Sequence, residues 1–408
     1  MERLGTMTAT AAFALVLGLA TTAGCSSGST GSDGTTDESS LQADVNSASM
    51  LLPGALLFFS SNPQLHGNGR ACGTCHRLEN QLALTPATVE ARYQALQSAR
   101  LLNPSADDPL FRSIDADDGA NDYTTLRTRG LIRVRMPLPP NVHLIDDPTA
   151  TSVVVLRAVP TVINASLTAP YQLDGREQTL ESQALGAFHA HAQVTLDPSA
   201  SALTAIGDFE KSLYSSFAVR KMALAVLAGD TSPPDPDPPL TALQAQGKAL
   251  FANFCGGCHG GPSMTHINEP RAFPPFDGTH QRASISVLVS APSPPGFGLP
   301  ASNGLPIHTY AVTINTPNGP TTIVRPSDDP GRVLLTGDPN DFNAFDVPTL
   351  RGISKTAPYF HNNTANTLED VVRHYQGVFK FVAEGLKFPF PELPDEDVTP
   401  IVEYLKVL

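Results

Sequence analysis

The sequence contains no tryptophan and only five cysteines among 408 residues, and its acidic residues outnumber its basic ones. Four of the cysteines fall in two short motifs, so no set of pairs remains for a disulfide framework. The formal net charge of −13 argues against nucleic acid as a partner. Beyond the N-terminal segment no apolar run is long enough to span a bilayer, and the chain is long enough for two domains.

The motif Cys-x-x-Cys-His occurs twice, at residues 72–76 and 255–259. It is the attachment signature of c-type haem, in which two thiols bond one porphyrin edge and the adjacent histidine ligates the iron. A zinc site would need four ligands in each cluster, and no further cysteine is available. We therefore expect two covalently bound haems c, attached through Cys72, Cys75, Cys255 and Cys258, with His76 and His259 as the proximal iron ligands.

The N-terminus has the features of an export signal: Arg3, an apolar run over residues 11–20, and Thr-Ala-Gly before Cys25. Residues 1–25 resemble a bacterial lipoprotein signal, in which Cys25 is lipidated; ordinary secretion with a free thiol is the alternative. Ser/Gly/Thr/Asp-rich residues 26–45 are typical of a flexible tether. We expect a periplasmic protein with a lipid anchor in the outer membrane.

Helical spacing and capping residues predict most of the secondary structure. Helices are expected over residues 54–59, 86–98 with Thr85 as the cap, 178–190, 203–228, 243–254 and 395–408. In the fourth of these, Leu203, Ile206, Phe209, Leu213 and Phe217 form an inward stripe, and in the last Val398, Ile401, Val402 and Leu405 do so. Extended segments are expected over 131–137 and 151–156, loops over 102–125 and 290–306, and a β-hairpin over 309–325 turned at Asn318-Gly319.

A Pro/Asp-rich linker at residues 229–240 cannot form a helix or a central strand and is the predicted domain boundary. It separates an N-terminal haem c domain, 46–228, from a C-terminal one, 241–408. The expected fold is mainly α, with two tandem cytochrome c-like haem domains, a small β-hairpin and long loops.

An internal repeat supports this duplication. Residues 159–181 match residues 347–369 without a gap, and 11 of the 23 positions are identical. Each half therefore carries one haem signature followed by one copy of the repeated segment.

The repeated segments also resemble the bacterial di-haem cytochrome c peroxidases and their MauG relatives, over roughly residues 50–80 and 150–408 of this chain. The residues that carry the resemblance are Val159–Gln183, with Asp174-Gly175-Arg176, and Phe345–Tyr375. The resemblance implies that one haem is open to H₂O₂ and that the other, six-coordinate, relays electrons from a small redox protein such as a cytochrome c or a cupredoxin.

The resemblance implies that the distal ligand of the C-terminal haem is Tyr375, where peroxidases proper usually have Met and MauG-type enzymes have Tyr. His374 and Met264 are less favoured ligands, and His361 is expected to support the site. The equivalent position in the first repeat is Ala187, whose methyl group cannot ligate iron, so the N-terminal haem is expected to be open.

Family members often cap the open haem with a loop histidine, and His143 or Met136 would be the candidates here. The resemblance also implies that Gln183 is a catalytic residue. The family's acid–base Glu is replaced by Gln193, which cannot exchange a proton, so His189 and His191 are expected to take over proton transfer.

Two further family positions differ. Leu173 stands where a Trp usually lies between the haems, and Tyr171 is the oxidisable alternative. A Ca²⁺ site would use Thr356 and Pro358, but its Asn position is Ala158, so one oxygen ligand is missing.

The sequence thus predicts a peroxide-reducing di-haem oxidoreductase. A non-catalytic di-haem electron-transfer cytochrome is the alternative, which the replaced Glu and Trp favour, and an O₂-using oxygenase is a third hypothesis.

Overall fold

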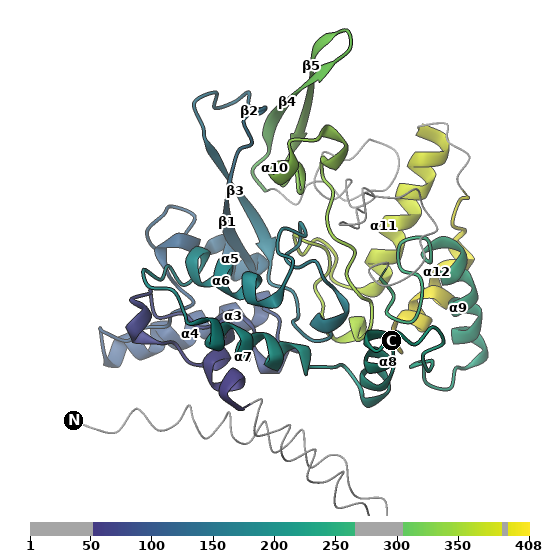
Figure 1. Cartoon of the computed structure of the whole chain (residues 1–408), viewed down its shortest axis with the longest axis horizontal. Helices are drawn as coiled ribbons and strands as arrows, with labels where there is room; N and C mark the ends of the chain where they lie inside the picture. Colours follow the sequence, from purple (N-terminus) through teal and green to yellow (C-terminus); the bar gives the residue numbers. More distant parts are fainter. Residues whose placement is uncertain (1–51, 266–304, 386–390) are drawn as a thin grey trace, which may run out of the picture. The chain divides into compact units, whose positions relative to one another are not determined.

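The computed structural model describes residues 52–265, 305–385 and 391–408 (Figure 1). The signal peptide, Cys25, the tether and most of the loop expected at 290–306 lie outside these residues. The chain forms two compact units, Met1–Cys75 with Leu180–Leu213, and His76–Thr179 with Tyr214–Leu408. The linker at 229–240 lies within the second unit, and the division into two haem domains at that linker stays a prediction.

The first unit is helical. Its elements are a helix over residues 52–59, the 3₁₀ turn η1 (Pro63–Leu65), α3 (Cys72–Cys75), α6 (Leu180–Ala190) and α7 (Ala200–Lys211). The first helix packs closely on α7, since a Cβ added at Gly54 would lie 2.0 Å from the carbonyl oxygen of Ala205. Phe209 of α7 completes this contact by packing against Phe58 and Phe59, with ring centroids 5.3 and 6.0 Å apart.

The second unit contains the remaining helices and all the strands of the described residues. Its α-helices are α4 (Pro86–Leu102), α5 (Thr124–Arg129), α8 (Phe217–Leu227), α9 (Ala242–Phe254), α10 (Val333–Thr336), α11 (Leu368–Lys380) and α12 (Asp395–Leu405). Its 3₁₀ turns are η2 (Leu78–Asn80), η3 (Ser113–Asp115), η4 (Ala165–Leu167), η7 (Pro339–Asp341) and η8 (Ile353–Lys355), and a π-turn, η9 (Phe381–Gly385), follows α11. The expected mainly helical fold is confirmed.

The helix starts follow the capping residues of the sequence. The Thr85 hydroxyl accepts a hydrogen bond from the Thr88 N–H and begins α4, as predicted. Thr241 at α9 and Thr367 at α11 each form a reciprocal capping box. These caps fix where α9 and α11 begin, and both helices carry residues of the candidate site.

Helices α9 and α12 lie side by side in the core of the second unit (Figure 1). A Cβ added at Gly247 would lie 1.9 Å from the Pro400 carbonyl oxygen, so only glycine allows this approach. Phe251 and Tyr404 pack edge to face, with centroids 5.6 Å apart. The predicted inward stripe of α12 is confirmed, because Val398, Ile401, Val402 and Leu405 are all buried.

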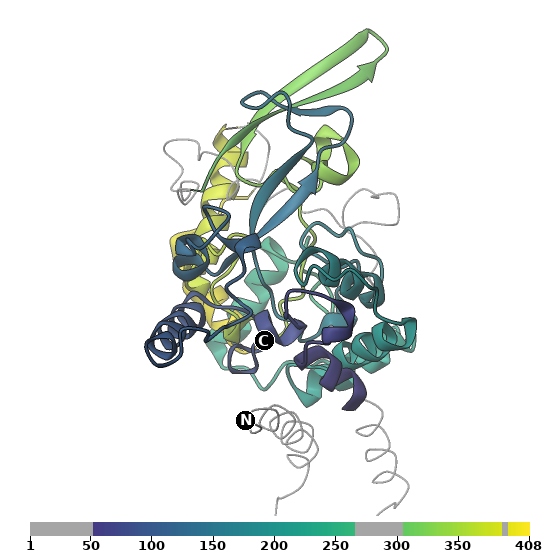
Figure 2. The same cartoon turned by 90° about the vertical axis from the view of Figure 1, so that its left-hand side faces the viewer.

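Two small antiparallel sheets contain the five strands of the described residues. They are β1 (Leu131–Pro137), β2 (Val142–Leu144), β3 (Ser152–Ala158), β4 (His308–Thr316) and β5 (Gly319–Ser327). Strand β1 pairs with β3, and β2 pairs with the long β4–β5 hairpin (Figure 2). The hairpin is confirmed, but its turn is one residue earlier than predicted: Thr316 pairs with Gly319, so Pro317 and Asn318 form the loop.

The prediction of one long helix over 203–228 is wrong, because this segment forms two helices, α7 and α8. Ser216 caps α8 by accepting a hydrogen bond from the Val219 N–H, so the chain turns between the two. Ile206 and Phe209 are buried as expected, whereas Phe217 is 78% exposed. In the described part of the chain, no helix is both long enough and apolar enough to span a bilayer.

The two copies of the repeat share backbone details that the sequence match does not specify. Each has a 3₁₀ turn at the same place, η4 and η8, and each has a cis X-Pro bond, at Ala169–Pro170 and Ala357–Pro358. Tyr171 pairs with Glu177 in the first copy, and Tyr359 pairs with Ala365 in the second. The same conformation at the same positions supports a duplication.

Candidate haem sites

The two motif histidines are held in the same way. His76 Nδ1 lies 2.8 Å from the carbonyl oxygen of Leu82, and His259 Nδ1 lies 3.1 Å from that of Met264. A carbonyl oxygen only accepts, so Nδ1 is the donor in both contacts, which is the tautomer in which Nε2 can ligate a metal. Leu82 and Met264 both have positive φ, +58° and +54°, so the same turn aims both carbonyls. This is the arrangement expected of proximal iron ligands.

None of the four motif cysteines forms a disulfide, and all four are half-buried. Burial raises the pKa of Cys72, Cys255 and Cys258, so these thiols are protonated at neutral pH. Cys72 and Cys75 form α3 in the first unit, where Phe59 packs against Gly73. The reactive groups are therefore present and unpaired by disulfides.

A largely apolar cavity of about 290 Å³ lies in the second unit beside the second motif. Cys255, Cys258, His259 and Tyr375 line it together with side chains of α9, α11 and α12. Phe254 and Phe379 stack on its wall, with ring centroids 6.2 Å apart. The attachment cysteines, a histidine whose Nδ1 faces a carbonyl and an apolar lining make this cavity fit a haem c.

Tyr375 is the candidate distal ligand that reaches this cavity. Burial, with the Cys258 and Cys255 thiols nearby, raises the pKa of its phenol. Neither His374 nor Met264, the less favoured ligands, lines the cavity. His374 is buried with no hydrogen bond to a described residue, and burial lowers its pKa to about 4. The geometry supports Tyr375 among the three.

His361 lies where the sequence predicts a supporting residue. It lines the cavity and stacks on Phe345, with ring centroids 4.0 Å apart and planes at 17°. Burial lowers its pKa to about 4, so the ring is neutral at physiological pH. It therefore contributes a flat, uncharged wall to the cavity.

The position that Trp occupies in the family also lines this cavity. Leu173 faces it, and the Leu173 carbonyl accepts a 2.9 Å hydrogen bond from the Asp346 N–H. Asp346 also lines the cavity, and burial raises the pKa of its carboxyl well above the usual value. Tyr171, the oxidisable alternative, is half-buried and does not line the cavity.

The predicted catalytic residues of the first unit lie on and just after α6. Gln183 and Ala187 are one helical turn apart, so they share a face of α6. His189 is exposed, and its Nε2 lies 2.7 Å from Asp197 Oδ1. The structure thus places Gln183 and Ala187 together and aims His189 at a surface carboxylate.

The chain around His191 and Gln193 forms a turn bound by Asn68. The Asn68 side-chain amide donates to the His191 carbonyl at 2.9 Å and to Gln193 Oε1 at 3.0 Å. Gln193 has a φ of +53° and is exposed. Its amide therefore anchors a turn, a structural role that sequence reasoning did not anticipate.

The two candidate caps of the N-terminal haem are placed differently. Met136 is buried on β1, and its sulfur accepts a 3.8 Å hydrogen bond from Arg176 Nη1. His143 is exposed on β2. Capping by either residue stays a prediction.

Calcium also stays a prediction. Thr356 and Pro358 line the cavity, and Ala158 donates its N–H to the His361 carbonyl at 2.7 Å. Across the described residues, no group of three or more His, Cys, Asp or Glu is arranged to hold a metal ion.

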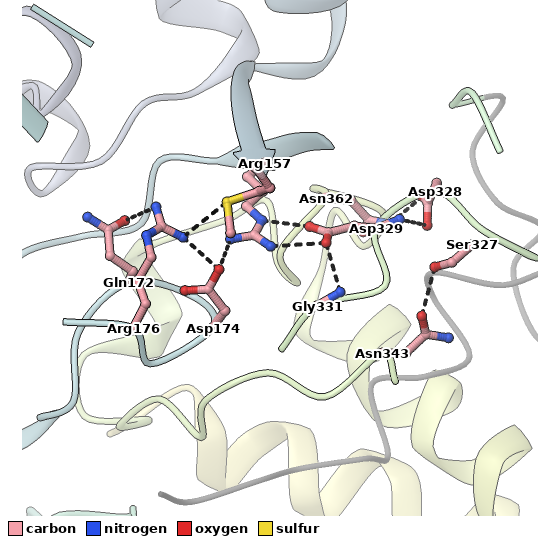
Figure 3. Close-up of polar contacts among 11 residues, drawn as sticks. Arg157, Gln172, Asp174, Arg176, Ser327, Asp328, Asp329, Gly331, Asn343 and Asn362 are labelled. Carbon is pink, nitrogen blue, oxygen red and sulfur yellow. Dashed lines mark hydrogen bonds and ion pairs between the residues drawn. The ribbon is translucent and has the colours of Figure 1, made fainter. Parts of the chain in front are cut away.

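A buried charge network that the sequence did not reveal supports the segment containing Leu173 (Figure 3). Arg157 pairs with Asp174 at 2.5 Å and with Asp329 at 2.6 Å, and Arg176 pairs with Asp174 at 2.6 Å. Arg157 keeps the pKa of Asp174 low although the carboxyl is buried. The Asp-Gly-Arg motif signals the pairing of Asp174, but only the fold brings Arg157 and Asp329 to it.

A second buried carboxyl, Glu210, lies at the end of α7 in the first unit. Its Oε2 has no hydrogen-bond partner, and burial together with Glu181 raises its pKa to about 8. Glu210 also raises the pKa of the Cys72 thiol. The apolar spacing that includes Phe209 predicts which face of α7 is buried. No pattern in the sequence shows that Glu210 is buried as well.

Sequence comparison finds bacterial peroxidases. The chain is 41% identical over 78 residues to a cytochrome c551 peroxidase of Nitrosomonas europaea, which is 19% of this chain and 21% of the relative. It is 26% identical over 237 residues to a cytochrome c551 peroxidase of Pseudomonas aeruginosa, 53% of this chain and 56% of the relative. A cytochrome c peroxidase of Denitromonas iodatirespirans is 28% identical over 138 residues, 33% of this chain and 32% of that one. The chain spans between a fifth and just over half of these relatives' lengths, and no family model matches it.

Solved structures with similar folds include a MauG-like protein associated with microbial copper homeostasis. It is 19% identical, with a TM-score of 0.45 and 88% of both chains covered. The diheme peroxidase BthA of Burkholderia thailandensis is 16% identical, with a TM-score of 0.40 and coverage of 88% of this chain and 86% of that one. The sequence relatives confirm the resemblance that the repeated segments predicted.

Proposed function

We propose that this chain, a relative of the bacterial di-haem cytochrome c peroxidases and MauG-like proteins, is a di-haem c-type oxidoreductase that reduces H₂O₂. Peroxide would be reduced at the N-terminal haem, and a small redox protein, a cytochrome c or a cupredoxin, would supply electrons through the C-terminal haem. The overall reaction consumes two electrons and two protons for each H₂O₂ and yields two waters. Bound haem c supplies iron that changes oxidation state one electron at a time and binds peroxide where a coordination position is open.

The observation that supports this proposal is a difference at one position of the repeat, while the histidines of the two haem motifs are held in the same way. His76 and His259 each give Nδ1–H to a carbonyl, which is the tautomer in which Nε2 can ligate iron. At equivalent positions of the repeat, α6 has Ala187 where α11 has Tyr375. A methyl group leaves a coordination position open, whereas a phenol closes one, so the two haems would divide the work.

Proton transfer at the N-terminal haem would depend on residues of α6 and the turn after it. Gln183 carries an amide that donates and accepts hydrogen bonds but does not exchange protons, so it would orient peroxide. His189, in contact with Asp197, and His191 carry imidazoles, a group that can accept and donate a proton. We assign the proton shuttle to these two histidines rather than to Gln193, whose amide is held by Asn68.

The peroxide test uses the purified holoprotein, a reduced cytochrome and H₂O₂. Peroxide-dependent oxidation of the cytochrome is expected, and His189→Gln with His191→Gln should slow it by about 10²-fold or more if they carry the protons. The control is Gln193→Ala, which removes an anchoring amide and not a proton carrier. No peroxide-dependent oxidation under any reduction state would overturn the proposal.

The second candidate function is a di-haem electron-transfer cytochrome without catalysis. The observation that favours it is that Gln193 and Leu173 replace the proton-exchanging and oxidisable residues of the family. It predicts rapid electron exchange with redox proteins and no response to H₂O₂. The same peroxide experiment separates the two functions.

We also propose that the protein is periplasmic and anchored to the outer membrane through a lipid on Cys25. The signal-like residues 1–25 and the covalent haem, which requires export, support this location. Cys25→Ala should release the protein from the membrane fraction.

For calcium, carbonyl oxygens of Thr356 and Pro358 would be the ligands, and retention of the ion after chelator-free dialysis is the test.

A further inference from the structure

Helix α8 exposes large apolar side chains on the side that faces away from its core. Phe217 is 78% exposed, Leu224 51% and Leu227 55%. The opposite side of α8 is buried, since Val219, Met222 and Ala223 pack with Leu167 in a small core. These exposed residues recur at helical spacing, seven and three positions apart, so they belong to one broad face. A cluster of this kind marks an interaction site more often than a single exposed Leu does.

Two cations lie between these apolar side chains. Arg220 and Lys221 are exposed, and neither side chain makes a hydrogen bond or ion pair with any residue that the structure describes. The whole chain has a formal net charge of −13, so an unpaired basic pair on an apolar surface is a local exception. Asp230, after the end of α8, is the exposed acid nearest to these two residues in the sequence. We call Phe217, Arg220, Lys221, Leu224 and Leu227 the α8 face.

The start of α8 is bonded to the wall of the C-terminal cavity. The Asn164 side chain accepts a 3.0 Å hydrogen bond from the Ser215 N–H and donates a 2.8 Å bond to the Arg351 carbonyl. Ile163, next to Asn164, and Arg351 both line the cavity. A Cβ added at Gly352 would lie 2.8 Å from Ser215 Cβ, so the two segments are in close contact. The start of α8 is therefore held by segments that line the cavity containing Cys255, Cys258 and His259.

We propose that the α8 face is the docking surface for an acidic electron-donor protein that reduces the C-terminal haem. The inference rests on the proposed function only for the presence of that haem. In the step itself the docked donor loses one electron and the haem iron gains it, and no bond or proton is transferred. Arg220 and Lys221 steer the negative partner, and the apolar side chains provide the contact that desolvates the complex.

The size and composition of the α8 face suit a transient complex. Weak electron-transfer encounters bury less surface than stable complexes, and charge complementarity acts mainly on their association rate. A face of three large apolar side chains and two cations provides such a contact without holding the partner. An acidic donor is selected because the rest of this acidic chain would repel it elsewhere.

The test measures reduction of the C-terminal haem in the full-length holoprotein by stopped flow, without peroxide. The probes are two reduced mono-haem cytochromes, one acidic and one basic. Arg220→Glu with Lys221→Glu should lower the second-order rate for the acidic probe by roughly tenfold or more at low salt. Leu224→Ser with Leu227→Ser should lower it at all salt concentrations. Rising ionic strength should slow the wild-type reaction with the acidic probe.

The matched control is Leu101→Ser with Leu102→Ser at the end of α4, where the leucines are 87% and 91% exposed. This variant should leave both rates unchanged. Equal rates for wild type and both α8 variants, or faster reduction by the basic probe than by the acidic one, would overturn the docking surface. This test uses no peroxide, so its result does not depend on peroxidase activity. A protein that shows these rate changes but has no peroxidase activity would contradict the proposed function and still support the α8 face as the docking surface.

Discussion

The N–H of Asp346 donates a 2.9 Å hydrogen bond to the carbonyl oxygen of Leu173. The equivalent residues of the repeat form the reciprocal bond, from the Ala158 N–H to the His361 carbonyl at 2.7 Å. Position 158 corresponds to 346, and 173 to 361, so the two copies bind each other in a symmetric pair. The wall of the C-terminal cavity is therefore built from both copies of the repeat, and the first copy contributes Leu173 to it.

Replacing Tyr375 by Met should raise the reduction potential of the C-terminal haem. A phenol oxygen is a hard donor that favours ferric iron, whereas a thioether favours ferrous iron. Spectroelectrochemistry of wild type and Tyr375→Met measures the change, and the charge-transfer bands should change with it. His374→Phe is the control, since His374 does not line the cavity. A potential and spectrum that do not change in Tyr375→Met would remove the ligand assignment.

Removing Arg157 should destabilise the second unit strongly. The guanidinium neutralises two buried carboxylates, Asp174 and Asp329, and breaking such a network leaves charge buried without a partner. Arg157→Met should lower the free energy of unfolding by about 3–5 kcal/mol, measured by urea denaturation.

The exposed pair of Arg373 with Glu369, 2.8 Å apart, is the control for that measurement. Arg373→Met should leave the free energy of unfolding almost unchanged, because water already solvates both charges. A similar loss in the two variants would mean that the buried network does not contribute as argued.

Glu210 should make stability depend on pH. Burial raises its pKa in the folded protein to about 8, above that of an unfolded chain. The folded state then binds the extra proton, so this contribution to stability is complete below about pH 4 and is lost as the pH rises towards 8. At about 1.4 kcal/mol per pKa unit, the effect amounts to a few kcal/mol.

Glu210→Gln should remove this pH dependence and melt at a higher temperature than wild type at pH 8. Thermal unfolding at pH 5 and pH 8 measures it, with the exposed Glu396→Gln as the control. If wild type and Glu210→Gln lose stability in parallel as the pH rises, Glu210 is ionised in the folded protein and the assignment is wrong.

Local signals in the sequence were enough to predict the helices around the second haem motif. Thr241 and Gln244 cap α9, the apolar spacing of α12 matches its buried side, and the turn after each haem motif aims a carbonyl at the histidine. The repeat also indicated that Ala187 and Tyr375 are equivalent. Short-range chemistry and sequence spacing determine all of these features.

Features that depend on distant contacts did not follow from the sequence. The spacing that placed Phe217 in an inward stripe continues across Ser216, but the Ser216 cap restarts the helix and turns Phe217 outward. Arg157 and Asp329 are 172 positions apart, so no local pattern links them. The hydrogen bond from Asn68 to Gln193 joins residues 125 positions apart, and no local pattern indicates the burial of Glu210.

The central claim is that the two haems differ in their distal coordination, and electron paramagnetic resonance of the resting ferric holoprotein tests it most directly. An open position opposite His76 and a Tyr375 ligand opposite His259 predict one high-spin and one low-spin ferric signal of equal intensity. Two low-spin signals would contradict the account, because a side chain would then occupy the position where peroxide is proposed to bind.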